Sequence, residues 1–125
     1  MADTDELFGD MHWEGIKGPI KQLQLRHRSW EFSNFPRHSP ENCIFGMMEE
    51  LGELTHAWLK HEQGIREYDE DKLEGEVEDA VGDIFFYMLA LCNNVGLDFY
   101  QLLRSTAQIV WARDWIKFPK NGVSE

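Results

Sequence analysis

The chain has 125 residues, of which 42% are hydrophobic and 28% charged, which is the ordinary composition of one globular domain with a core. Its formal net charge of -11 argues against binding to a nucleic-acid polymer, because no basic patch is available to replace the counterions of the phosphates. That charge still allows a nucleotide whose phosphates arrive on a divalent cation.

Four helices are predicted along the chain, and no run shows the alternation that is typical of a strand. We expect one domain, with residues 1–15 as a loose arm and 120–125 as a frayed tail. Gly18-Pro19 predicts the start of the first helix, with proline at the first helical position, and the helix would run to about Glu31. An aromatic loop over 32–38 follows it.

The second helix has the clearest boundaries in the sequence. Ser39–Glu41 reads as an N-cap serine, a proline and an acid near the positive helix end. The helix should continue to about Gln63, with Gly64 as the residue that ends it.

Asp69 or Asp71 could cap the third helix, which should reach about Asn93. Asp98 is expected to cap the fourth helix, and Phe118-Pro119 to stop it. Four helices joined by short loops predict an all-α fold of the four-helix bundle type.

The second and third helices share an unusual feature, because each carries carboxylates beside its apolar stripe rather than opposite it. At about 100° per residue, Glu50 and Glu53 border the stripe of the second helix, and Glu76, Asp79 and Asp83 border that of the third. The stripe of the second helix consists of Ile44, Met47, Met48, Leu51, Leu54, Trp58 and Leu59. Facing helices of this kind would gather four or five like charges, which makes physical sense only around a cation. Carboxylate ligands favour Mg²⁺ or Mn²⁺.

Asp83 strengthens this interpretation. It interrupts the apolar run 80–88, and no lysine or arginine lies within a helical turn of it. An uncompensated carboxylate near a packed seam is unfavourable, so we expect it to share a metal ion with the other acids. His56 stands three residues after Glu53, which is half of a di-iron signature. The third helix has no histidine for the second half, and helical angles place His56 on the surface.

The acids and their context resemble those of the MazG-like, all-α nucleoside triphosphate pyrophosphohydrolases. The resemblance rests on Glu50-x-x-Glu53, a gap, and acids that end in Asp83 before a helix rich in Phe, Tyr and Leu. It covers roughly residues 39–103, with a weaker echo at 111–115.

The second half of the family pattern, Glu-x-x-Asp, fits this sequence in two registers. By spacing it falls on Glu76 and Asp79. By context the family's aspartate is Asp83, in which case Ala80 stands where the family has glutamate, and Asp79 could substitute from one position earlier. Both registers remain open at this point.

The resemblance implies a Mg²⁺-dependent hydrolysis of a nucleoside triphosphate to its monophosphate and pyrophosphate, with water attacking the α-phosphorus. The implied metal ligands are Glu50, Glu53, Glu76, Asp79 and Asp83. A carboxylate that is not fully used by metal would accept the proton of the water, with Glu53 as first choice and Glu49 as second.

An anionic substrate also needs cationic and stacking contacts. Arg113 and Lys117, spaced i, i+4 late on the fourth helix, are the candidates for the phosphates, with Lys120 next, although charges at a helix end also complement its dipole. Trp30 could stack on a base, as could the tryptophans at 111 and 115, although core packing is the common role of such residues. Asn34, in the loop after the first helix, could read the base.

Broad apolar stripes on two long helices need more burial than one bundle offers, and the family is commonly dimeric or tetrameric, so we expect a homo-oligomer. Cys43 and Cys92 fall in apolar segments and are expected to be reduced core residues. Met1–Asp10 is acidic and no transmembrane run appears, which favours a cytoplasmic protein. Two other classes stay open: a catalytically silent helical module that binds nucleotide or protein, and a di-metal redox bundle.

Overall fold

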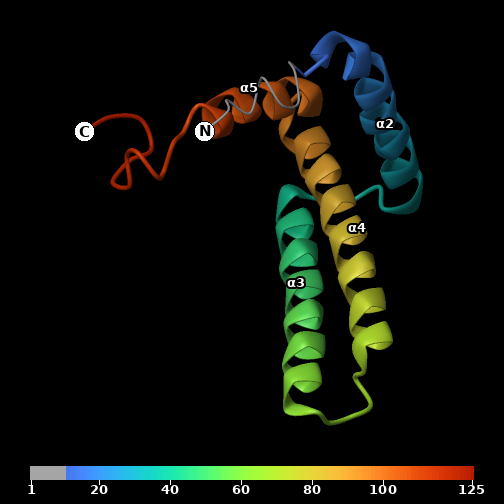
Figure 1. Cartoon of the computed structure of the whole chain (residues 1–125). Helices are drawn as coiled ribbons and strands as arrows, with labels where there is room; N and C mark the ends of the chain where they lie inside the picture. The colour runs from blue at the N-terminus through green and yellow to red at the C-terminus, as the bar shows by residue number, and fades with distance from the viewer. Residues whose placement is uncertain (1–10) are drawn as a thin grey trace. The chain divides into compact units, whose positions relative to one another are not determined.

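The computed structural model describes residues 11–125, and the expectations for Met1–Asp10 lie outside the described residues. Over this range the chain is all-α, as predicted, with four helices and no strand (Figure 1). The helices are α2 (Trp13–Asn34), α3 (Pro40–Gln63), α4 (Glu70–Val95) and α5 (Phe99–Trp111). No single helix in this part of the chain is long and apolar enough to span a membrane, and α4 and α5 meet those criteria only when taken together.

Contacts divide the chain into two compact units. One contains the described residues up to Leu23 together with Asp98–Glu125, and the other is Gln24–Leu97. The second unit holds α3 and α4, which run antiparallel side by side, and the C-terminal part of α2 (Figure 1). The single domain expected from the sequence stays a prediction.

The boundaries of α3 and α4 confirm the expected capping residues. Ser39 has extended backbone angles and accepts a hydrogen bond from the first turn of α3, while Gly64 ends that helix in the left-handed region at φ 68°. Asp69, rather than Asp71, caps α4 by accepting from a backbone N–H at 2.9 Å. α4 continues to its left-handed C-cap, Gly96.

The start of α2 differs from the prediction, because the helix begins at Trp13 and carries Pro19 in its interior. The extra turn has tertiary support. The Trp13 ring lies 6.4 Å from the ring of Tyr100 and 6.0 Å from that of Trp111, both within the same unit. These aromatic contacts stabilise a turn that the local sequence alone does not favour.

The end of α5 also differs, since the helix stops at Trp111 and not at Phe118-Pro119. The side chain of Asp114 accepts hydrogen bonds from two following backbone N–H groups, a local arrangement that competes with a helix. The Asp114 N–H donates to the Gly122 carbonyl at 2.8 Å, and the Gly122 N–H donates to the Phe118 carbonyl at 2.7 Å. The segment expected to fray is thus held in hydrogen-bonded turns.

The contact between α3 and α4 uses small residues on α3. Cys43 and Ala57 are buried there, and Gly46 lies against the ring of Tyr87. The apolar stripe of α3, expected to form the helical seam, is instead largely solvent-exposed. Exposed members are Ile44, Met48, Leu51, Trp58 and Leu59.

Candidate functional site

A half-buried carboxylate, Glu50, lies at the centre of the acidic cluster between α3 and α4. Its pKa is raised first by burial and then by repulsion from the carboxylates of Asp83, Glu53, Glu49 and Asp79. Two of these neighbours lie on α4, so acids of both helices act on the same group. Of the predicted acids, Glu53, Asp79 and Asp83 therefore influence Glu50, and the metal site itself stays a prediction.

Tyr87 belongs to the same neighbourhood, although the sequence had not predicted a role for it. Burial raises the pKa of its phenol, and the carboxylates of Glu50, Glu49 and Asp83 raise it further. Its place was readable in principle, because Tyr87 follows Asp83 by one helical turn and shares its side of α4. The ring reaches α3 where Gly46 offers no side chain.

The acids at this site have no cationic protein partner among the ion pairs of residues 11–125. Those ion pairs join Lys21 to Asp98, Glu31 to His38 and Glu14 to Arg104. Hard oxygen ligands with excess negative charge match a divalent cation such as Mg²⁺. The donor chemistry around Glu50 therefore fits the metal that the resemblance implies.

The carboxylates are not drawn tightly together. Among described residues, one group of three ligand atoms lies within 4.8 Å of one another, and it is a different one: Glu31, His38 and Cys43. The carboxylates around Glu50 therefore act on it as charges and do not form such a compact group.

The remaining predicted ligands separate into two cases. Asp79 is among the carboxylates that raise the pKa of Glu50, whereas Glu76, half-buried on α4, is not. The side chain of Asp83 is exposed, so the expectation that it lies near a packed seam is wrong, and Glu50 has that position instead. Ala80 is 3% exposed and packs in the core.

The predicted phosphate contacts lie outside the helix. Because α5 ends at Trp111, the pairing of Arg113 and Lys117 on one helical face is wrong. The guanidinium of Arg113 lies 5.9 Å from the ring of Trp115, and the Lys117 ammonium lies 5.2 Å from the ring of Phe118. Both cations belong to the compact unit that contains Asp98–Glu125, whereas the acids belong to the Gln24–Leu97 unit.

Trp30 is part of an aromatic group within the same unit as the acids. It is 45% exposed and stacks on His27 with centroids 5.4 Å apart, and its edge meets Phe35. The ring of His27 in turn meets the ring of Phe86 on α4, with their centroids 5.0 Å apart. Asn34 is the last residue of α2 rather than part of the loop, and its amide donates to the Trp30 carbonyl at 2.8 Å.

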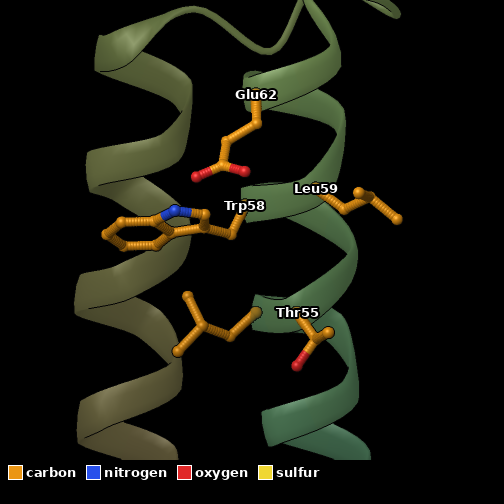
Figure 2. Close-up of a pocket in the computed structure, with 5 residues that line it drawn as sticks. Thr55, Trp58, Leu59 and Glu62 are labelled. Atoms are coloured by element: carbon orange, nitrogen blue, oxygen red, sulfur yellow. The ribbon is translucent and has the colours of Figure 1, made fainter.

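A shallow depression of about 380 Å³ lies on the exposed apolar stripe of α3. It is lined by Leu54, Thr55, Trp58, Leu59 and Glu62, whose side chains leave successive turns of one helix (Figure 2). The lining offers one carboxylate and one hydroxyl among apolar groups, which is more typical of a surface that packs against another protein than of a catalytic site. His56, expected at the surface, is exposed on the same helix.

Comparison with known proteins gives no match: no family model, curated protein or solved structure resembles this chain. The likeness to the MazG-like enzymes accordingly depends on the motif residues themselves.

Proposed function

We propose that this protein is a Mg²⁺-dependent nucleoside triphosphate pyrophosphohydrolase of the MazG-like type. The observation that supports it most strongly is the electrostatic environment of Glu50, on which four carboxylates from two helices act. Carboxylates of like charge repel one another, and a bound cation would relieve this repulsion. A site that binds metal-complexed phosphates uses this charge directly.

Metal binding is assigned to the acids that converge on Glu50. Glu50, Glu53 and Asp83 would hold the ion, with Asp79 favoured over Glu76 as the further ligand because its charge acts on Glu50. Bound Mg²⁺ supplies charge neutralisation for the phosphates and lowers the pKa of a coordinated water.

Proton transfer is assigned to an exposed carboxylate at the edge of the cluster. Glu53, or Glu49 one position before Glu50, would accept the proton of the water that attacks the α-phosphorus. The new bond joins the water oxygen to that phosphorus, and the bond to the bridging oxygen breaks. Pyrophosphate leaves with the electron pair, and a monophosphate remains.

The aromatic group beside α4 favours a nucleotide over a bare metal ion as the ligand. Phe86 follows Asp83 by three residues and Asp79 by seven, so the ring and both acids share one side of the helix. Through His27, Phe86 is linked to the partly exposed Trp30. A base stacked on these rings would leave its phosphates near the acids.

A second candidate is a catalytically silent nucleotide- or protein-binding module. One observation favours it: in the register that ends at Asp83, the family's glutamate is replaced by the buried Ala80, which offers no ligand. The two functions differ in whether product forms.

The test is pyrophosphate release from a panel of ribo- and deoxynucleoside triphosphates, with Mg²⁺ or with a chelator. We expect equal amounts of monophosphate and pyrophosphate, and only with the metal present. Asp83→Asn should lower the rate by roughly 100-fold or more, since loss of a metal ligand removes several kcal/mol of transition-state stabilisation.

Glu78→Gln is the matched control, because Glu78 is an exposed acid on α4 that is not among the carboxylates acting on Glu50. It removes the same charge and should leave the rate unchanged. If folded wild-type protein binds Mg²⁺ and a triphosphate without turning the nucleotide over, the silent module is the correct function.

A further inference from the structure

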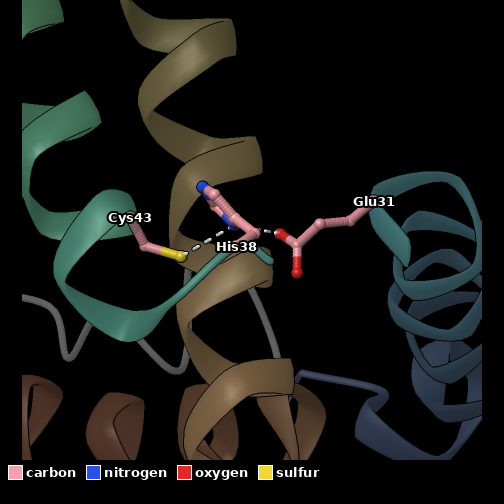
Figure 3. Close-up of side chains that lie close together, drawn as sticks. All are labelled: Glu31, His38 and Cys43. Atoms are coloured by element: carbon pink, nitrogen blue, oxygen red, sulfur yellow. Dashed lines mark hydrogen bonds and ion pairs between the residues drawn. The ribbon is translucent and has the colours of Figure 1, made fainter. Parts of the chain in front are cut away.

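Three side chains from three separate segments meet at a second site within the Gln24–Leu97 unit (Figure 3). Glu31 comes from the last turn of α2, His38 from the loop before α3, and Cys43 from the first turn of α3. Glu31 is the buried charged residue of the described chain at 8% exposure, and Cys43 is at 0%. None of these groups is used by the proposed hydrolysis.

One imidazole nitrogen faces both other groups. The Nδ1 atom of His38 lies 3.0 Å from the Oε2 atom of Glu31 and 3.6 Å from the Sγ atom of Cys43. Around tetrahedral Zn²⁺, ligand atoms bound at about 2.0–2.3 Å are separated by roughly 3.3–3.8 Å. The sulfur–nitrogen separation already has this value, and the oxygen–nitrogen separation needs a shift of a few tenths of an ångström.

The surroundings supply hydrogen bonds to two of the same side chains. The Asn94 amide donates to the Oε1 atom of Glu31 at 2.9 Å and lies 3.7 Å from the sulfur of Cys43. It is fixed by a further bond to the Ala90 carbonyl at 2.8 Å. A donor that contacts both a carboxylate and a thiol orients the two side chains, as the outer partners of metal ligands do.

We propose that Glu31, His38 and Cys43 form a zinc-binding site, with water as the fourth ligand. Thiol and imidazole donors select Zn²⁺ over Mg²⁺, so this site and the acids around Glu50 would hold different metals. Binding places the ion between sulfur, nitrogen and oxygen, and the thiol proton of Cys43 is released to solvent. The bound ion would fix the end of α2 to the start of α3.

The proposal is independent of the hydrolysis and is tested by Co²⁺ titration of the metal-free, full-length protein in excess Mg²⁺, which keeps Co²⁺ off the carboxylates. We expect one equivalent per chain, with the visible bands of tetrahedral Co²⁺ and a near-ultraviolet charge-transfer band from thiolate to cobalt. Zn²⁺ should displace the cobalt and abolish both features.

Variants show which residues hold the ion. Cys43→Ser should abolish the charge-transfer band, and His38→Ala should weaken Co²⁺ binding by at least 10-fold. Asn94→Ala should weaken it by roughly 10- to 100-fold as an outer partner. Cys92→Ser is the matched control, because Cys92 is also a buried free cysteine but lies outside the cluster, and it should leave the spectrum unchanged.

Circular dichroism confirms the fold of each variant, and His38→Ala decides the question if Cys43→Ser does not fold. A folded wild type without the thiolate band overturns the proposal, as does a Cys43→Ser protein with the wild-type spectrum. In that case the three side chains form only a hydrogen-bonded cluster that joins α2 to α3.

Discussion

At Gly46 the backbone of α3 lies close against the ring of Tyr87 on α4. A Cβ atom at this position would overlap the tyrosine ring. Gly46→Ala should therefore destabilise the protein by about 1–3 kcal/mol, in spite of the higher helix propensity of alanine. Urea unfolding monitored by circular dichroism measures the change.

Gly52 provides the matched control, since it lies in the same helix and a Cβ atom there meets nothing within 4 Å. Gly52→Ala should stabilise the protein by roughly 0.4–1 kcal/mol. The two substitutions are thus expected to have opposite signs. Equal effects would mean that the contact with Tyr87 does not restrict this helix pair.

Glu50 is expected to link the stability of the protein to pH and, under the proposed function, to Mg²⁺. Because its pKa is raised by burial and by neighbouring carboxylates, the folded state holds the Glu50 proton more tightly than the unfolded state does. Stability therefore falls as pH rises from the unfolded pKa, about 4.3, through the raised folded pKa. In a chelator at pH 7, Glu50→Gln should melt at a higher temperature than wild type, and this advantage should vanish below about pH 4.

Mg²⁺ should reverse that order. Under the proposed function, wild type should gain stability from the bound ion, whereas Glu50→Gln has lost a proposed ligand and should gain less. Thermal melts with Mg²⁺ and with chelator, for wild type, Glu50→Gln and Glu78→Gln, give the comparison. A melting temperature of Glu50→Gln below wild type in chelator would show that the charge of Glu50 is not a source of instability.

At the scale of single elements, Asp98 combines a helix cap with an ion pair. Burial alone would raise its pKa, but hydrogen bonds from the Gln101 N–H and from Lys21 outweigh this effect and lower it. A lowered folded pKa gives stability that is present above the unfolded pKa, about 3.9, and lost as pH falls through the folded pKa.

Asp98→Ala should cost about 1 kcal/mol at pH 7, the usual effect of removing an N-cap. Asp98→Asn keeps the capping geometry but not the charge, so its stability should be less sensitive to pH between about 2 and 5. Chemical unfolding of the three proteins across that range measures both effects. Parallel pH profiles for wild type and Asp98→Asn would contradict the assigned ionisation.

The sequence was most informative where a boundary depends on local chemistry. Ser39, Asp69 and Asp98 cap their helices as expected, because a side chain within one turn satisfies the free N–H groups. The start of α2 could not be predicted from local sequence, because Trp13 packs against the rings of Tyr100 and Trp111, which are distant in the chain. The early end of α5 depends on Asp114, whose side chain competes with a helix that the hydrophobic pattern would extend.

The acidic site was predictable for a similar reason. Helical angles fix which carboxylates of one helix share a side, and they predicted the approach of Asp79 and Asp83 to Glu50, although Glu76 was expected there as well. Helical angles do not predict which acid is half-buried, because this depends on which side of α3 packs against α4. The buried side carries small residues, and the apolar stripe is left exposed. The group of Glu31, His38 and Cys43 matches no familiar spacing, and only the path of the loop brings it together.

At the scale of the whole molecule, one apolar side of α3 is left exposed to solvent in the Gln24–Leu97 unit. Met48 is 63% exposed and Leu51 and Trp58 are each 49% exposed, on neighbouring turns of one helix. α4 adds Val81 and Met88, which are exposed as well. Exposed apolar side chains on one side of a helix are typical of protein interfaces, and the homo-oligomer expected from the sequence stays a proposal in which a second copy of the chain covers this side of α3.

Leu51→Glu should separate such a homo-oligomer into monomers, because it places a charge within the apolar stripe. His56→Glu is the control, since His56 is exposed on the same helix about 140° away from Leu51 and should keep the assembly intact. Sedimentation velocity over a range of concentrations gives the mass of each protein. A wild type that is monomeric at all concentrations would contradict the interface, while a smaller Leu51→Glu species that retains its helical spectrum would show that the stripe holds the copies together.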